Sequence, residues 1–231
     1  IPFQLLKGRF IPAAYLSFLF GSLNVCIVWL MVARLRKEYL PAIRTLDVYA
    51  VTILYAFGTT NFYIGTLGSV WHVDQMVSMF FGNLGVYFIL KKRRRLRDYM
   101  LSSWSMMVTL LGRATLSMLF ALPALFFIED FIPGKKVTGE NLWKFIFLGA
   151  KTFGVAAGVC TTLFFLYNYA RFGNVFEYGY RYIHEAPYLE AIRLRNGTIS
   201  WANLPTNLWY MVAEIPKISL DPVLNMEINL K

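Results

Sequence analysis

The feature that most constrains this sequence is an apolar stretch of about 45 residues, from position 46 to position 90. As one α-helix, rising about 1.5 Å per residue, the stretch would be about 68 Å long, roughly twice the 30 Å of hydrocarbon in a bilayer. We therefore expect the chain to turn once within it, at its main polar cluster, residues 71–74. The stretch thus predicts two helices, over residues 46–70 and 75–90.

Three further apolar segments reach the length of about 20 residues that a membrane crossing requires. They predict helices over residues 11–33, 103–128 and 143–170, with Pro123 bending the second of these. The composition agrees, because 57% of the residues are hydrophobic and only 16% are charged, against about 25% charged in typical soluble domains. We expect an all-α integral membrane protein with about five transmembrane helices, forming a bundle over residues 1–170.

Beyond residue 170 the sequence changes character. The segment 171–231 carries four prolines and many Tyr and Trp residues, and it has no apolar run long enough to span a membrane. Tyr and Trp favour membrane interfaces and protein interfaces alike. We expect a C-terminal polar-aromatic arm outside the membrane that gains its order by lying against another surface.

Basic residues gather at the ends of the apolar segments and predict a topology. The chain holds 23 Lys and Arg against 13 Asp and Glu. With five spans, the loops on one side hold ten basic residues and the loops on the other side hold five. Because Lys and Arg resist translocation, the side with ten, and the C-terminal arm with it, is expected to face the cytoplasm or the mitochondrial matrix. The placement at helix ends also argues against nucleic acid as a partner.

A run of basic residues after the third expected helix is the strongest local signal. It comprises Lys91, Lys92, Arg93, Arg94, Arg95 and Arg97. One interpretation is a topogenic stop, whose side chains extend to the lipid headgroups. The other is a binding site for an anionic phospholipid, with cardiolipin as one candidate, since each cation near a charged leaflet contributes about 1 kcal/mol.

Two cations fall inside expected spans. Arg113 would lie about 15 Å deep and Lys151 about 12 Å deep, where a charge needs water, a partner or protein to face. We expect no acidic residue of this chain at the depth of Arg113. Its guanidinium would then face carbonyl or hydroxyl groups within the bundle, pair with a carboxylate or lipid phosphate of a neighbouring subunit, or line a substrate path. The second of these makes the chain incomplete by itself.

The last expected helix carries small residues at a helical spacing. Ala150, Gly154 and Gly158 recur every four residues and share one face, along which two helix backbones can approach closely. Such a face packs either within the chain or against another protein.

Residue patterns of enzyme chemistry are missing from the sequence. His72 and His184 fall on opposite sides of the expected membrane, and Cys26 and Cys160 lie in apolar segments without metal-ligand spacing. We expect no catalytic residue, no metal and no cofactor. The sequence favours a non-catalytic accessory or structural subunit of a larger membrane complex, of the respiratory-chain or ATP synthase type. Its partners would be other membrane subunits and anionic phospholipid.

The alternative function is that of a small anion transporter or channel component, in which Arg113 and Lys151 recognise the anion. The favoured location is the mitochondrial inner membrane with the C-terminus in the matrix, on the grounds of the aromatic arm and a chain that starts at Ile1 instead of Met. The alternative location is a bacterial inner membrane with the C-terminus in the cytoplasm.

Overall fold

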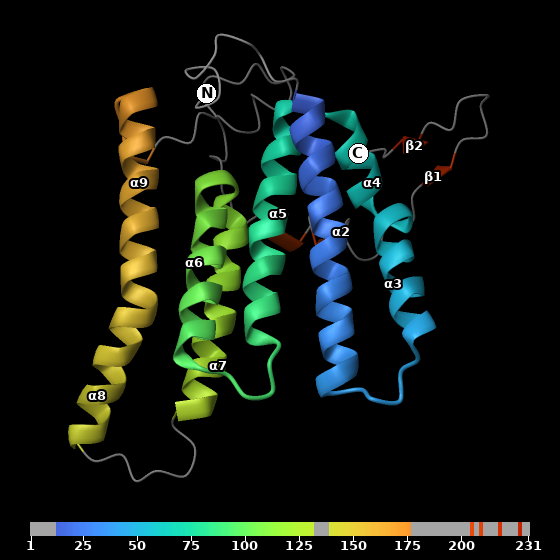
Figure 1. The fold of residues 1–231 in the computed structure, drawn as a ribbon. Coiled ribbons are helices and arrows are strands. Elements are labelled where there is room, and N and C mark those ends of the chain that lie inside the picture. The colour runs from blue at the N-terminus through green and yellow to red at the C-terminus, as the bar shows by residue number, and fades with distance from the viewer. Residues whose placement is uncertain are drawn as a thin grey trace. The chain divides into compact units, whose positions relative to one another are not determined.

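The computed structural model describes residues 13–131, 139–176, 204–205, 208–209, 217–218 and 226–227. The chain divides into two compact units, Ile1–Glu177 and Tyr178–Lys231. The described residues of the first unit form helices and their connections (Figure 1), which confirms the all-α class of the bundle. In the second unit, β1 (Lys217–Ile218) and β2 (Met226–Glu227) pair as two antiparallel strands. Most of the expected C-terminal arm lies outside the described residues.

The first half of the bundle contains four helices. They are α2 (Ala13–Glu38), α3 (Thr45–Gly58), α4 (Thr60–Leu67) and α5 (Val70–Ile89). The helix expected over residues 46–70 is therefore broken at Thr59, whose hydroxyl accepts a hydrogen bond from the backbone N–H of Asn61 at 3.2 Å and so caps α4.

The turn expected at residues 71–74 is wrong, because these residues belong to the first turns of α5. The chain turns earlier, at Gly68, whose φ of +62° lies in the left-handed region that a residue with a Cβ rarely adopts. A Cβ at Gly68 would also lie 2.4 Å from the Cα of Ala14 in α2, so both conformation and space select glycine there.

The single helix expected over residues 103–128 is wrong. Helix α6 (Leu96–Gly112) ends where Arg113 takes an extended conformation, with φ −117° and ψ 98°, and the chain then folds back. It returns through a 3₁₀ segment, η1 (Ala114–Phe120), and α7 (Ala121–Phe131). The hydroxyl of Tyr99, near the start of α6, contacts Phe126 and Asp130 near the end of α7, so the two helices are antiparallel. Pro123 sits in the first turn of α7, where its missing N–H costs little.

The last described pass along the bundle is one long helical stretch. It consists of α8 (Gly139–Gly149), a π-helical turn η2 (Ala150–Gly154) and α9 (Val155–Phe172), and it includes the helix expected over residues 143–170. Within the described chain, Ala13–Glu38 and Leu142–Phe172 are the two helices both long and apolar enough to cross a membrane. They give limited support to membrane association, and the count of five spans is not confirmed.

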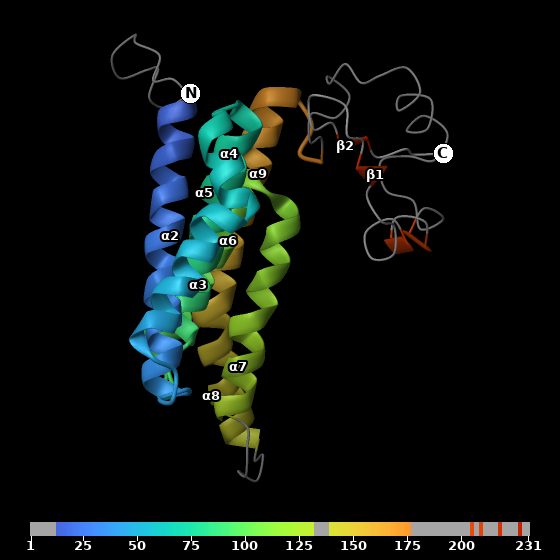
Figure 2. The same cartoon turned by 90° about the vertical axis from the view of Figure 1, so that its right-hand side faces the viewer.

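The helices of the first unit run between two ends of the bundle (Figures 1 and 2). At one end, called the basic end here, α2 and α5 finish and α3 and α6 begin, so the loops after Glu38 and Ile89 lie there. The turn at Gly68, the reversal at Arg113 and the end of α9 lie at the opposite end. The fold-back at Arg113 adds one pass, so α9 ends away from the basic end and not on the expected side.

Buried polar side chains connect the helices inside the bundle. Ser17 of α2 donates to the carbonyl oxygen of Ile64 at 2.9 Å. Asn24 of α2, fully buried, donates to the carbonyl oxygen of Met76 at 3.0 Å and accepts from the amide of Asn83 at 3.2 Å. These bonds hold α2 against α4 and α5, because a buried polar group without a partner is costly.

Candidate functional site

The basic loop between α5 and α6 contains two cations that are bound within the bundle. The guanidinium of Arg94 donates to both carboxylate oxygens of Asp130 at 3.0 Å and to the carbonyl oxygen of Ile89 at 2.9 Å, and it lies over the ring of Phe126. The ammonium group of Lys91 pairs with Oδ1 of the buried carboxylate of Asp98. Burial by itself would lower the pKa of Arg94, but its neighbours Tyr99 and Asp130 outweigh burial and raise that pKa. These two cations connect the loop to α6 and α7.

The other four cations of the run point outwards. Lys92, Arg93, Arg95 and Arg97 are exposed, and we call them the outer cations. Among the described residues, the side chains of the first three make no hydrogen bond or ion pair. An anion that approaches the basic end therefore meets the outer cations, while Lys91 and Arg94 are already engaged.

The basic loop is also connected to α2. Arg34 donates to the carbonyl oxygen of Tyr87 at 2.7 Å and to its hydroxyl at 2.6 Å, and its guanidinium lies 3.7 Å from the centre of that ring. Glu38, in the last turn of α2, accepts from the backbone N–H of Lys92. The contacts of Arg34, Tyr87 and Glu38 are not predicted from the sequence. The only local signal was Asp98, an acidic residue in the first turn of a helix, where it accepts from the backbone N–H of Arg95 at 2.9 Å.

Arg113 does not lie inside a continuous helix, because it forms the turn between α6 and η1. Its Nε lies 3.6 Å from Oδ2 of Asp74 in α5, and both side chains are about one-third exposed, at 34% and 38%. The distance makes this an ion pair without a hydrogen bond to Nε. The expectation that Arg113 has no counter-charge in its own chain is therefore wrong. The pairing arises because Asp74 belongs to α5 and the end of α6 packs beside it, so that Asp74 meets the turn after Gly112.

Lys151 lies in η2 and is exposed. It makes no ion pair with the described residues, whereas Arg113 pairs with Asp74, so the two cations share no counter-charge. A π-helical turn such as η2 occurs often at functional sites, but here it holds only one titratable side chain.

The expected packing face of the last helix is not used within the described chain. The side of η2 and α9 that faces α6 consists of Thr152, Ala156 and Cys160, which are buried. Gly154 and Gly158 are exposed, and a Cβ added to either glycine meets no atom within 4 Å. The small residues Ala150, Gly154 and Gly158 therefore form an outward face, offset by two residues from the buried one.

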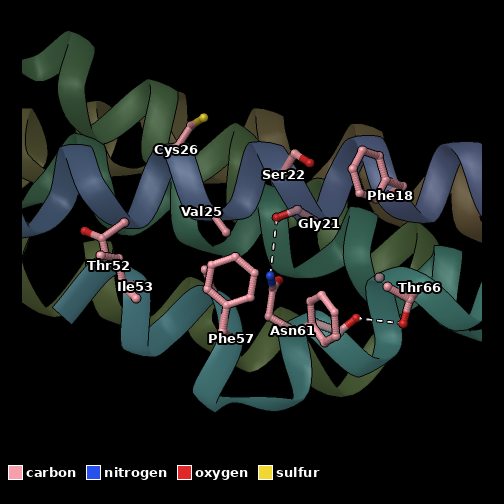
Figure 3. A pocket seen from close by; sticks show the side chains of 13 residues that line it. Phe18, Gly21, Ser22, Val25, Cys26, Thr52, Ile53, Phe57, Asn61 and Thr66 are labelled. Carbon is pink, nitrogen blue, oxygen red and sulfur yellow. Dashed lines mark hydrogen bonds between the residues drawn. The ribbon is translucent and has the colours of Figure 1, made fainter. Parts of the chain in front are cut away.

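An apolar groove with a volume of about 520 Å³ lies between α2 and the α3–α4 pair (Figure 3). Its walls are mostly aliphatic and aromatic, with Phe18 and Val25 from α2 and Ile53, Phe57 and Phe62 from α3 and α4. The amide of Asn61 points across the groove to α2 and donates to the carbonyl oxygen of Gly21 at 3.4 Å. The groove is not predicted from the sequence, in which the polar residues just before Asn61 are the one local signal.

The described residues hold no cluster of three or more His, Cys, Asp or Glu side chains that could bind a metal ion. Comparison with known proteins adds no assignment, because no protein-family model, no characterised protein and no solved structure matches this chain. The function is therefore argued from the geometry of the bundle.

Proposed function

We propose that this chain is a non-catalytic structural component of a membrane protein assembly. The observation that carries the proposal is that polar side chains inside the bundle bind one helix to another. Ser17, Asn24 and Asn83 hydrogen-bond between helices, and Asp74 meets the charge of Arg113. These contacts hold helices together, as expected of a scaffold, whereas a transport path or a catalytic cleft needs polar groups that face a substrate.

The proposal no longer depends on an unmatched charge at Arg113. A guanidinium paired with Asp74 requires no carboxylate or phosphate from a neighbouring subunit. The same pairing weakens the alternative of an anion transporter, because the cation that would recognise the anion already has a counter-charge. We therefore do not favour the transporter.

The outward face of η2 and α9 suits packing against a partner helix. Glycine inside a helix destabilises it by about 0.5–1 kcal/mol relative to alanine, and the cost is offset where the missing side chain lets another backbone approach. Gly154 and Gly158 have open space beside them, so nothing in the described chain offsets that cost. A helix of another subunit, packed against Ala150, Gly154 and Gly158, would do so.

We further propose that the bundle spans its membrane with the basic end towards the cytoplasm or the mitochondrial matrix. The end of α9 then lies on the other side, so the proposed side of the C-terminal segment is opposite to the one expected from the sequence. The outer cations would face the negatively charged leaflet and bind anionic phospholipid, for example cardiolipin. The rule of positive charge applies to both proposed locations, the mitochondrial inner membrane and a bacterial inner membrane.

Native mass spectrometry of the chain extracted from its own membrane tests the proposal. We expect a complex with other hydrophobic subunits, which the double variant Gly154→Leu, Gly158→Leu dissociates. Leu163→Phe adds bulk at an exposed position of α9 outside the small-residue face and is the matched control. A chain that is extracted alone and remains stable as a monomer, with or without the substitutions, would refute the proposal.

A further inference from the structure

The loops that follow α2 and α5 meet at the basic end (Figure 1). Glu38, in the last turn of α2, accepts a hydrogen bond from the backbone N–H of Lys92, which lies 54 residues further along the chain. One turn earlier in α2, Arg34 donates to the carbonyl oxygen and the hydroxyl of Tyr87 in α5. The two loops are therefore fixed against each other at two levels.

The cations of these loops divide into those that hold the backbone and those that face outwards. Arg36 donates from Nε to the carbonyl oxygen of Ile43 at 2.7 Å and so closes the loop after α2. Lys91 and Arg94 hold the loop after α5 in the same way. Lys37 is exposed and makes no hydrogen bond or ion pair with the part of the chain that the structure describes. Together with the outer cations it forms what we call the joint basic surface, which comprises Lys37, Lys92, Arg93, Arg95 and Arg97.

The contact at Glu38 brings the cations of the two loops close together. Lys37 directly precedes Glu38, so standard bond lengths and one hydrogen bond place its Cα within about 13 Å of the Cα of Lys92. Like charges that are held on one surface repel one another. An anion that contacts cations of both loops at once removes part of this repulsion.

Apolar side chains lie beside these cations. Tyr39 and Leu40, which directly follow Glu38, are 41% and 50% exposed. Tyr favours the interface between membrane and water, and exposed Leu favours hydrocarbon. The joint basic surface therefore suits the headgroup region of a bilayer better than it suits an anion dissolved in water.

We propose that the joint basic surface binds one phospholipid whose headgroup carries two phosphate groups, with cations of both loops on the same headgroup. The inference rests on the proposed function, which turns the basic end towards an anionic leaflet, and it names the class of lipid. Once one phosphate is bound, contact with the second phosphate of the same molecule is intramolecular, whereas two separate lipids must each lose their freedom of motion. Glu38 is a positioning residue, because it holds the loops together although its own charge repels phosphate.

Native mass spectrometry of the full-length chain in nanodiscs tests the choice of lipid. One sample contains cardiolipin, which has two phosphates, and the other contains phosphatidylglycerol, which has one, at twice the molar amount, so that the total charge is equal. We expect the chain to retain one cardiolipin, preferred by about tenfold or more over phosphatidylglycerol. Equal retention of the two lipids would mean that only charge density matters and would overturn the proposal.

Two variants of Glu38 separate positioning from charge. Glu38→Ala removes both the negative charge and the acceptor of the Lys92 N–H, whereas Glu38→Gln removes the charge and keeps an acceptor. We expect Glu38→Ala to reduce the preference for cardiolipin by about threefold to tenfold, the ratio of one hydrogen bond, and Glu38→Gln to preserve it. Glu129→Ala removes an exposed acid at the same end without joining the loops and is the matched control.

The outcomes also distinguish this inference from the proposed function. If Glu38→Ala strengthens lipid retention as much as Glu129→Ala does, Glu38 acts only as a charge and the positioning role is wrong. If Lys37→Gln leaves the preference for cardiolipin unchanged while Arg93→Gln reduces it, the lipid contacts one loop only and the joint site is refuted, although anionic lipid still binds the outer cations. Circular dichroism of each variant shows that the helices have formed.

Discussion

Replacing Gly85 by alanine tests the closest contact between α5 and α6. A Cβ at this position would lie 2.5 Å from Cγ of Met106 and 3.2 Å from the carbonyl oxygen of Ser102. Neither atom can move easily, because Met106 is fully buried against Ile89 and Tyr99 in the core and the oxygen belongs to the α6 backbone. The added methyl group must therefore push the two helices apart or force Met106 out of its rotamer.

The expected magnitude is the difference between two opposing effects. Overpacking a well-filled core costs about 1–3 kcal/mol, while alanine favours the helix over glycine by about 1 kcal/mol. Gly85→Ala should lower the free energy of unfolding by up to about 2 kcal/mol. Gly154→Ala gains the same helix preference and meets no atom, so in the isolated chain it should raise that free energy by about 0.5–1 kcal/mol.

The assay is reversible unfolding of the purified chain in mixed micelles of a mild detergent and SDS, followed by circular dichroism. Both substitutions convert a helical glycine into alanine, so each serves as the control for the other. Stabilisation by Gly85→Ala as large as that by Gly154→Ala would refute the described packing of α5 on α6. Destabilisation by Gly154→Ala in the monomer would refute the outward orientation of the small-residue face.

Four further predictions address the basic end and the topology. Tyr99→Phe keeps the buried ring but removes the hydroxyl that contacts Asp130 and Phe126, and it should destabilise the chain by about 0.5–1.5 kcal/mol in thermal unfolding. Changing the four outer cations to Gln should weaken the binding of anionic phospholipid by about 1 kcal/mol per charge removed. Less of this lipid should then co-purify, as measured by lipid mass spectrometry, and the melting temperature should stay unchanged. Lys91→Gln, by contrast, should lower the melting temperature, because it leaves the buried carboxylate of Asp98 without its partner. The sequence Asn196-Gly197-Thr198 matches the acceptor pattern for N-glycosylation. With the end of α9 opposite the basic end, Asn196 should be glycosylated when the chain is translated into endoplasmic reticulum membranes, and Asn196→Gln should abolish the modification.

The sequence predicted those helices that are long and apolar along their whole length. The expected helix over residues 11–33 corresponds to Ala13–Glu38, and the one over residues 143–170 lies within Leu142–Phe172. The helix expected over residues 103–128 fails because hydropathy measures only how apolar a segment is. A segment that crosses once and a segment that folds back on itself are equally apolar, and the break was marked only by Gly112 and Arg113.

The error at Arg113 follows from the same limit. Depth was counted along a helix that was assumed to continue, which placed the guanidinium far from every carboxylate. Once α6 ends at Gly112, the residue moves to the end of the bundle and meets Asp74 of α5. Neither the groove at Asn61 nor the pairing of Arg94 with Asp130 could be found in this way, because each joins residues of different helices whose relative placement is set by packing.

The fold-back at Arg113 also explains why the charge distribution fits the bundle better than it fits five spans. With five spans, Lys144 belongs to the side opposite the basic run, whereas α8, which contains it, lies at the basic end (Figure 1). Among the described residues, the loops and helix ends at the basic end then carry eleven Lys and Arg, and the opposite end carries two, Arg113 and Arg171. Arg113 is itself matched by Asp74, so the opposite end is close to neutral. An excess of Lys and Arg at one end of the helices is what insertion in a single orientation requires.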